Sequence, residues 1–187
     1  MLLALGLYLV INFAVQTVHV VGLSMYPTLD NDDYLIATKI DYRLHAPQRG
    51  DIIIMRDPFD PSKDFIKRVI GLPGEKLLIR NGQVFINGQA LQEPYINPEP
   101  WTVNANYPAA AGPGDVQPYV IPSGEYFVMG DNRNRSSDSR VFGSVKRNQI
   151  EARAWLRVIP VNRLGTVDGV HPSLSPGGSS SRAPTPG

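Results

Sequence analysis

Two side chains in this sequence could form a pair of nucleophile and base, Ser24 and Lys67. Ser24 comes near the end of a long uncharged stretch, and Pro27 fixes its own φ angle and keeps Tyr26 out of the helical region. Ser24 is therefore predicted to lie in extended or turn backbone. A serine close to a proline is most often a turn or capping residue, so its meaning depends on the rest of the chain.

Lys67 belongs to a run in which a two-residue period places it on one strand face with Phe65 and Val69. Burial between apolar neighbours disfavours the ammonium form and lowers the pKa of a lysine, and the neutral amine can then take a proton from a hydroxyl. Ser–Lys pairs use this chemistry without a histidine. The alternative is a surface lysine on an edge strand, where its charge discourages aggregation.

A dense polar loop, residues 130–140, reads G-D-N-R-N-R-S-S-D-S-R and follows a strand-like run. It is not a calcium loop, because Arg133 and Arg135 stand at positions where oxygen ligands are needed. We interpret it as a local network in which Asp138, Arg140 and the serines hold a sharp turn. Such a network is compatible with catalysis nearby.

Composition excludes several other classes of site. Lys and Arg number 18 and Asp and Glu 17, so charge gives no reason to expect a nucleic-acid partner. The sequence has no cysteine, which excludes disulfides, thiolate catalysis and cysteine-based metal sites, and its three histidines lack the spacing of a zinc helix. We expect neither a metal nor another cofactor.

The N-terminal stretch carries no charged residue from Met1 to Leu29. A helix over residues 2–22 would be about 30 Å long, close to the hydrocarbon thickness of a bilayer, so we predict a single membrane span. A cleavable signal peptide would need a basic start, which is absent, and a buried core helix is the other alternative. Without basic residues at the start, charge does not fix the orientation of the span.

Short apolar runs broken by Pro, Gly, Asn and Asp predict a mainly β fold after the serine. Asn81-Gly82 is a strong hairpin signal, and Asn87-Gly88 predicts a second turn, so we expect a β-meander there. The predicted strands cover residues 33–38, 51–56, 65–70, 76–80, 83–86, 125–129 and 150–158.

Two segments break this strand pattern. Residues 92–122 are rich in proline and contain few charges, which predicts a long surface excursion between two strands. Residues 164–187 are mostly Gly, Ser and Pro without an aromatic side chain, so we expect a disordered tail.

Taken together, these stretches resemble the type I signal peptidases, membrane-anchored Ser–Lys endopeptidases that remove signal peptides. The matching pieces are S-M-Y-P-T-L at 24–29, R-G-D-I-I-I at 49–54, K-R-V-I-G-L-P-G at 67–74 and the loop 130–140, in family order after one span. The resemblance covers the chain from the membrane to about Val158.

This resemblance implies a role for each matching residue. Ser24 would be the nucleophile and Lys67 the general base, with Ser136 orienting the lysine and with Asp138 and Arg140 as a structural pair beneath the site. Leu29, Phe65 and Ile66 would help to line shallow pockets for small side chains, and His19 would have no catalytic part. Some family members carry a serine two residues before the nucleophile that stabilises the oxyanion, whereas Gly22 stands there here.

The resemblance also implies a domain plan and partners. Residues 1–18 would be the membrane anchor and 19–163 a catalytic domain of coiled antiparallel sheets, with a core of 19–74 and 123–160 and an inserted hairpin and excursion at 75–122. The domain would lie on the non-cytoplasmic side of a plasma or thylakoid-type membrane. Its partners would be signal peptides of secretory preproteins and the lipid bilayer, with the export translocon left open.

Two alternatives remain at the level of the sequence. A self-cleaving Ser–Lys protease would need a DNA-binding segment before the serine, and only the apolar stretch stands there. A membrane-tethered β module for binding or scaffolding would use Ser24 and Lys67 only structurally. The distance between the Ser24 hydroxyl and the Lys67 amine separates the dyad from the scaffold.

Overall fold

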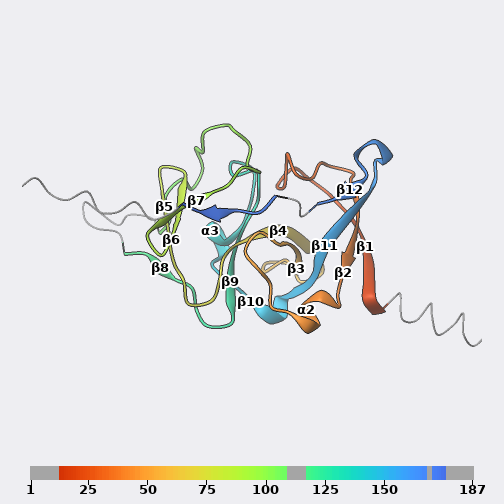
Figure 1. The fold of residues 1–187 in the computed structure, drawn as a ribbon, viewed down its shortest axis with the longest axis horizontal. Helices are drawn as coiled ribbons and strands as arrows, with labels where there is room; N and C mark the ends of the chain where they lie inside the picture. Colours follow the sequence, from red (N-terminus) through yellow and green to blue (C-terminus); the bar gives the residue numbers. More distant parts are fainter. Residues whose placement is uncertain (1–12, 109–116, 168–169, 176–187) are drawn as a thin grey trace, which may run out of the picture.

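The computed structural model describes residues 13–108, 117–167 and 170–175, and these form two antiparallel sheets (Figure 1). In the larger sheet the strand order is β1-β2-β11-β3-β4-β9-β10, and β12 pairs with β11. Its strands are β1 (Val15–His19), β2 (Tyr34–Thr38), β3 (Ile52–Arg56), β4 (Asp64–Gly71), β9 (Glu125–Met129), β10 (Val145–Lys146), β11 (Ile150–Ile159) and β12 (Gly165–Thr166).

The smaller sheet has the order β13-β7-β6-β5-β8 and lies at the opposite end of the molecule from β1 and β2 (Figure 1). Its strands are β5 (Lys76–Arg80), β6 (Gln83–Ile86), β7 (Gln89–Gln92), β8 (Tyr119–Val120) and β13 (Ser173–Leu174). Helical structure in the described residues is short: α2 (Asp41–Leu44), α3 (Ser139–Phe142), η1 (Arg147–Gln149) and η2 (Val161–Arg163).

The predicted β class is confirmed, and all seven predicted strands are present with ends within one residue of the prediction. The meander is also confirmed, since β5, β6 and β7 follow one another in the smaller sheet. Asn81 and Gly82 have φ angles of 48° and 78°, as a two-residue turn between β5 and β6 requires. Local turn chemistry therefore determines the register of this sheet.

Three groups of buried side chains form the core. One lies among β1, β2, β11 and β3 and includes Met25 and Leu29 from the turn that carries Ser24. A second fills the smaller sheet and reaches Ile70 at the end of β4, and a third covers the other face of β3, β4 and β9 around Val69. Strand β4 thus contributes side chains to separate cores along its length.

The predicted helix over residues 2–22 is wrong at its C-terminal end. Val15–His19 is strand β1, which pairs with β2 in the register Val15↔Thr38 to His19↔Tyr34. The β-branched Val15, Thr17 and Val18 suit a strand, and an apolar composition alone does not separate the two structures. No helix in the described ranges is long and apolar enough to cross a bilayer, and the rest of the predicted span, residues 1–12, lies outside them.

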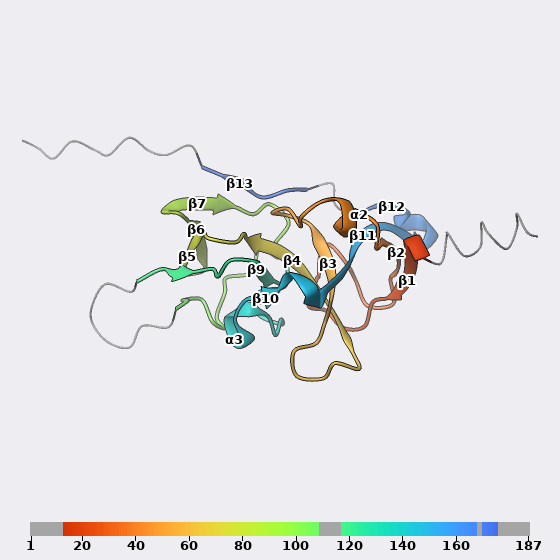
Figure 2. The ribbon, with the colours of Figure 1, turned by 90° about the horizontal axis from the view of Figure 1, so that it is seen from below.

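The predicted disordered tail is wrong for the part of residues 164–175 that the structure describes. Strand β12 pairs with β11, Val167 is buried, and β13 pairs with β7 (Figure 2). This C-terminal strap, residues 170–175, runs along the edge of the smaller sheet, where backbone hydrogen bonds need no large apolar side chain. The rest of the predicted tail, residues 176–187, lies outside the described residues.

Candidate active site

Ser24 lies in a tight turn between β1 and β2, as the sequence predicted. Two kinds of contact fix the turn. Met25 and Leu29 are buried in the core, and the amide of Leu29 donates a hydrogen bond to the carbonyl of Met25 at 2.9 Å. The side chains on either side of Met25 therefore face outward, and Ser24 is half-buried at the surface of the domain.

Lys67 lies on β4 and reaches the serine. Its Nζ atom donates a hydrogen bond to Ser24 Oγ at 3.1 Å and another to the carbonyl of Ile66 at 3.0 Å. Only 3% of the lysine is exposed, and its amine lies 4.8 Å from the centre of the Phe65 ring. The predicted strand face shared by Phe65, Lys67 and Val69 is therefore present, since Phe65 and Val69 belong to one core cluster.

Burial lowers the pKa of Lys67 to about 8, even though the carboxylates of Asp138, Asp57 and Asp131 act in the opposite direction. A free lysine titrates about two units higher. The amine next to Ser24 can therefore lose its proton at mildly alkaline pH, which is the condition for a lysine that acts as a base.

The polar loop 130–140, called the catalytic loop below, packs directly against the serine turn. The amide of Asn132 donates to the carbonyl of Ser24 at 3.0 Å. Gly130 allows this approach, because a Cβ atom at that position would overlap Ser136 Oγ and the Ser24 carbonyl. The sequence reasoning gave Gly130 no role, since a close approach between distant segments leaves no local signal.

Asp138 and Arg140 form a buried ion pair inside the catalytic loop, as expected. Arg140 Nε and a second guanidinium nitrogen each donate to the Asp138 carboxylate at 2.8 Å, and the amide of Gly130 donates to it at 3.0 Å. Asp138 also caps α3 by accepting from the amide of Arg140. Burial alone would raise the pKa of Asp138, but the hydrogen bonds and positive charge of Arg140, together with the Gly130 amide and the nearby Ser136 hydroxyl, outweigh it and hold that pKa below its usual range.

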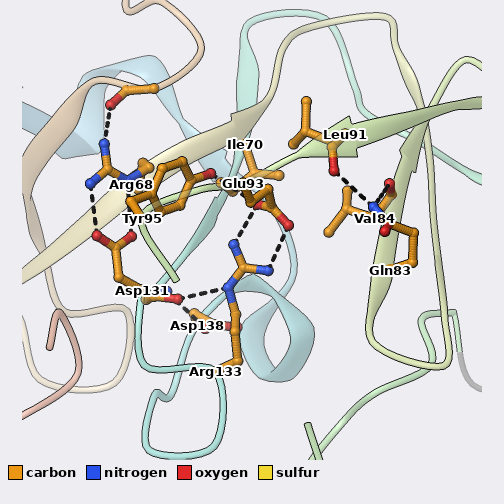
Figure 3. A network of polar contacts seen from close by, with 12 residues as sticks. Arg68, Ile70, Gln83, Val84, Leu91, Glu93, Tyr95, Asp131, Arg133 and Asp138 are labelled. Carbon is orange, nitrogen blue, oxygen red and sulfur yellow. Dashed lines mark hydrogen bonds and ion pairs between the residues drawn. The ribbon is translucent and has the colours of Figure 1, made fainter. Parts of the chain in front are cut away.

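A second buried ion pair, not predicted from the sequence, ties the site together (Figure 3). Arg68, next to Lys67, donates to both carboxylate oxygens of Asp131 at 2.9 and 2.7 Å. Thr28, on the serine turn, donates its hydroxyl proton to the same carboxylate at 2.5 Å. One carboxylate thus joins the nucleophile turn, the base strand and the catalytic loop.

A cleft of about 750 Å³ opens beside the dyad. Segments 16–25 and 63–67 form its walls, and Arg135 and Ser137 of the catalytic loop lie at its side. The antiparallel pairs β1·β2, β2·β11, β11·β3 and β3·β4 make β1 and β4 run in the same direction, so both walls end at the dyad. An extended chain fits a groove between two such strands.

Two of the three predicted pocket residues line the cleft and one does not. Phe65 and Ile66 line the cleft, whereas Leu29 is fully buried in the core and is not part of the lining. Leu29 follows the turn into the interior, and its position is fixed by packing with Met25. His19 also lines the cleft, but its Nε2 atom interacts with Asp32 at 3.0 Å and its ring stacks on Tyr34.

Comparison with known proteins identifies relatives of this chain. A family model described as signal peptidase, peptidase S26, matches residues 1–159. Signal peptidase I of Leptolyngbya laminosa is 42% identical over 173 residues, which cover 87% of this chain and 76% of the relative. The probable signal peptidase I-1 of Synechocystis sp. is 39% identical over 173 residues, covering 88% and 82%.

The chain belongs to the signal peptidase family, peptidase S26. A more distant relative, signal peptidase I of Bacillus caldolyticus, is 34% identical over 165 residues, which cover 86% of this chain and 85% of the relative. A solved structure of a signal peptidase I from Enterococcus faecalis is 36% identical, covers 58% of this chain and 97% of its own, and gives a TM-score of 0.44.

Gly22 is where the sequence departs from some signal peptidases, and the structure gives a physical reason. Its φ angle is +94°, a backbone conformation in which any residue with a Cβ atom is strained. The amide of Gly22 donates to the side chain of Asn31 at 2.8 Å, which fixes the chain just before the nucleophile. A serine at position 22 would therefore be strained in this backbone.

Ser136 is close to the dyad but is not bonded to it. Its hydroxyl oxygen is buried and has no hydrogen-bond partner within the described part of the chain, although Ser136 lies near enough to help to lower the pKa of Asp138. In the described residues no group of three His, Asp or Glu side chains could hold a metal ion. The chemistry available at this site is that of a hydroxyl, an amine and fixed backbone amides.

Proposed function

We propose that this chain is a membrane-anchored serine endopeptidase that removes N-terminal signal peptides from exported preproteins, with Ser24 as nucleophile and Lys67 as general base. The observation that carries the proposal is the 3.1 Å contact between Lys67 Nζ and Ser24 Oγ beside the cleft. Membership of the signal peptidase family supports the choice of substrate.

The reaction begins when Ser24 Oγ attacks the scissile carbonyl carbon and gives its proton to the neutral amine of Lys67. The tetrahedral intermediate collapses as the C–N bond breaks, and the Lys67 ammonium protonates the leaving amine. An ester between the signal peptide and Ser24 remains. Lys67 then takes a proton from water, the hydroxide breaks the ester bond, and the proton returns to Ser24 Oγ.

Three further parts of the site assist this chemistry. The Ser24 amide donates to the developing oxyanion, because Gly22 offers no hydroxyl for that task. Ser136 orients the Lys67 amine once substrate excludes water from the dyad. The Asp138–Arg140 pair holds the loop that carries Ser136, since both side chains are buried and bonded within that loop.

The substrate lies as an extended strand between the two parallel walls of the cleft, with the residues before the cut along Phe65 and Ile66. As the family resemblance implies, the pockets beside Lys67 are shallow, so small side chains such as alanine are accepted at the first and third positions before the cut. A bulky residue directly before the cut should therefore abolish processing.

The uncharged run from Met1 to Leu29 contains the membrane anchor in the part that precedes β1, with the catalytic domain on the non-cytoplasmic side of a plasma or thylakoid-type membrane. Its partners are the lipid bilayer and the signal peptides of secretory preproteins, with the export translocon as a further candidate. This position suits the reaction, because a signal peptide is cut just after its own apolar helix.

The direct test is cleavage of a purified preprotein by the full chain in detergent or lipid, analysed by N-terminal sequencing of the product. We expect one cut after a small residue, and at least a thousand-fold loss with Ser24→Ala, since the nucleophile is gone. Equal cleavage by wild type and Ser24→Ala would refute Ser24 as the nucleophile. A folded wild-type enzyme that cuts no preprotein would refute the proposed function.

A further inference from the structure

The catalytic loop is held from outside by a segment of the excursion between β7 and β8. We call this segment, residues 93–103, the clasp. Glu93 accepts two hydrogen bonds from the Arg133 guanidinium, at 3.0 and 2.5 Å, and both side chains are buried (Figure 3). Tyr95 donates to Glu93 at 2.9 Å and covers the Arg68 guanidinium at 3.9 Å. The clasp therefore contacts both the loop and the base strand.

Trp101 is the centre of the clasp. Its ring lies 4.4 Å from the Arg133 guanidinium carbon and 5.6 Å from that of Arg140, so one ring faces both loop arginines. The ring also packs against Gly82, where a Cβ atom would come within 3.2 Å of it. The ring is thus fixed to the β5–β6 turn of the smaller sheet.

Backbone groups beside Trp101 make further hydrogen bonds with the catalytic loop. Asn134 accepts from the amide of Thr102 at 2.8 Å and donates to the carbonyl of Pro100 at 3.0 Å. Arg140 donates to the carbonyl of Val103 at 3.1 Å. The clasp therefore meets the catalytic loop at Arg133, Asn134 and Arg140, which span most of its length.

The held arginines in turn brace the backbone of the loop. Arg133 donates to the carbonyl of Gly130 at 2.9 Å, and Arg140 donates to the carbonyl of Arg133 at 2.8 Å. Gly130 and Asn132 are the residues that approach the Ser24 carbonyl. A continuous chain of contacts therefore leads from Trp101 to the nucleophile turn.

We propose that Trp101 is a positioning residue, through which the smaller sheet holds the catalytic loop against Ser24 and Lys67. This inference rests on the proposed function, because it concerns the efficiency of the same dyad. The inference gives the proline-rich excursion a role. The clasp contacts the loop arginines but does not contribute to the substrate cleft, since no clasp residue lines that cleft.

A loosened loop should change the reaction in a recognisable way. Small misplacements of a catalytic group cost up to about a hundred-fold in rate, so kcat should fall while KM changes little. Water would also reach Lys67, whose pKa is lowered mainly by burial. The neighbouring charged groups, Asp57 from the β3–β4 turn and Asp131, Asp138 and Arg140 from the loop, act less strongly than that burial. The midpoint of the pH–rate curve should therefore move to higher pH.

The experiment compares Trp101→Leu, Trp101→Phe and Trp155→Leu in the full chain. Trp155 is the matched control, because it is the other of two tryptophans in the chain and lies 45% exposed on β11, away from the clasp. We expect Trp101→Leu to lower kcat at least ten-fold with KM within about two-fold, and to raise the pH midpoint. Trp101→Phe, which keeps a ring for the arginines, should recover most of the rate, and Trp155→Leu should behave as wild type.

A second measurement needs no activity. Amide hydrogen exchange over residues 130–140, measured in the Ser24→Ala background, should speed up with Trp101→Leu and stay unchanged with Trp155→Leu. Unchanged kcat, pH midpoint and exchange in a folded Trp101→Leu enzyme would overturn the inference. If the wild-type enzyme itself cut no preprotein, the proposed function would fail instead, and the exchange result would still test the grip of the clasp.

Discussion

At the scale of single residues, the site depends on contacts made without any local sequence signal. The contact between Ser24 and Lys67 could be predicted because each stands out against its neighbours: a hydroxyl at the end of an apolar stretch and an amine on an apolar strand face. Thr28 and Asp131 could not, because their 2.5 Å hydrogen bond joins segments far apart in the chain. Leu29 was misjudged because the turn that carries Ser24 also sends side chains into the core, and Leu29 is buried there with Met25.

Gly130 provides the residue-scale prediction. In Gly130→Ala the new methyl group would overlap the Ser24 carbonyl and the Ser136 hydroxyl, so the catalytic loop and the serine turn must move apart. We expect kcat/KM to fall about a hundred-fold, with the free energy of unfolding also reduced. Gly124→Ala is the control for a glycine with open space around it, although its positive φ of 74° adds strain. Full activity of Gly130→Ala would show that the close approach does not matter.

At the scale of elements, strands with strong alternation or with Asn-Gly turns could be predicted, whereas elements set by distant pairing could not. The 150–158 run became β11 because its two-residue period matches a sheet with one buried face. Strand β13 has only two residues, both exposed, and exists because its backbone pairs with β7. Composition indicates only how much apolar surface a segment can bury by itself. Strand β13 forms because the folded domain offers the free edge of β7 for pairing.

The C-terminal strap gives the element-scale prediction. Its Val170 carbonyl accepts from Arg68 at 3.3 Å, and its Ser175 amide and hydroxyl bond to the β7 strand at 2.9 and 2.8 Å. Deleting residues 170–187 should reduce the free energy of unfolding by about 2–4 kcal/mol, since each intramolecular hydrogen bond contributes about 1 kcal/mol. Urea unfolding measures this loss, and deletion of 176–187 alone is the control. Equal stability of the two shortened chains would contradict the account.

At the scale of the whole molecule, the dyad is built where two sheets meet. The larger sheet supplies Lys67 and the serine turn, and the smaller sheet holds the catalytic loop through the clasp. Sequence motifs indicated the larger sheet in family order, but they gave no role to the smaller one, because its contacts with the loop involve scattered residues. We therefore expect both sheets to be needed for one active site.

The proposed membrane anchor is tested by comparing the chain from Met1 with a shortened chain. We expect the full chain to remain in the lipid pellet after an alkaline wash, because residues 1–12 extend an uncharged run. A chain that begins at Phe13 keeps β1 and should be recovered largely in the supernatant with part of its activity in detergent. Release of the full chain by the alkaline wash would contradict the anchor.

The central claim is that a neutral Lys67 activates Ser24, and the pH dependence of kcat/KM tests it most directly. Because Lys67 must lose its proton and burial lowers its pKa to about 8, the wild-type rate should rise with pH through a midpoint near that value. Lys67→Arg should be inactive at every pH, because a guanidinium stays protonated. Substantial turnover by Lys67→Arg, or a wild-type midpoint near that of free lysine, would show that another group is the base.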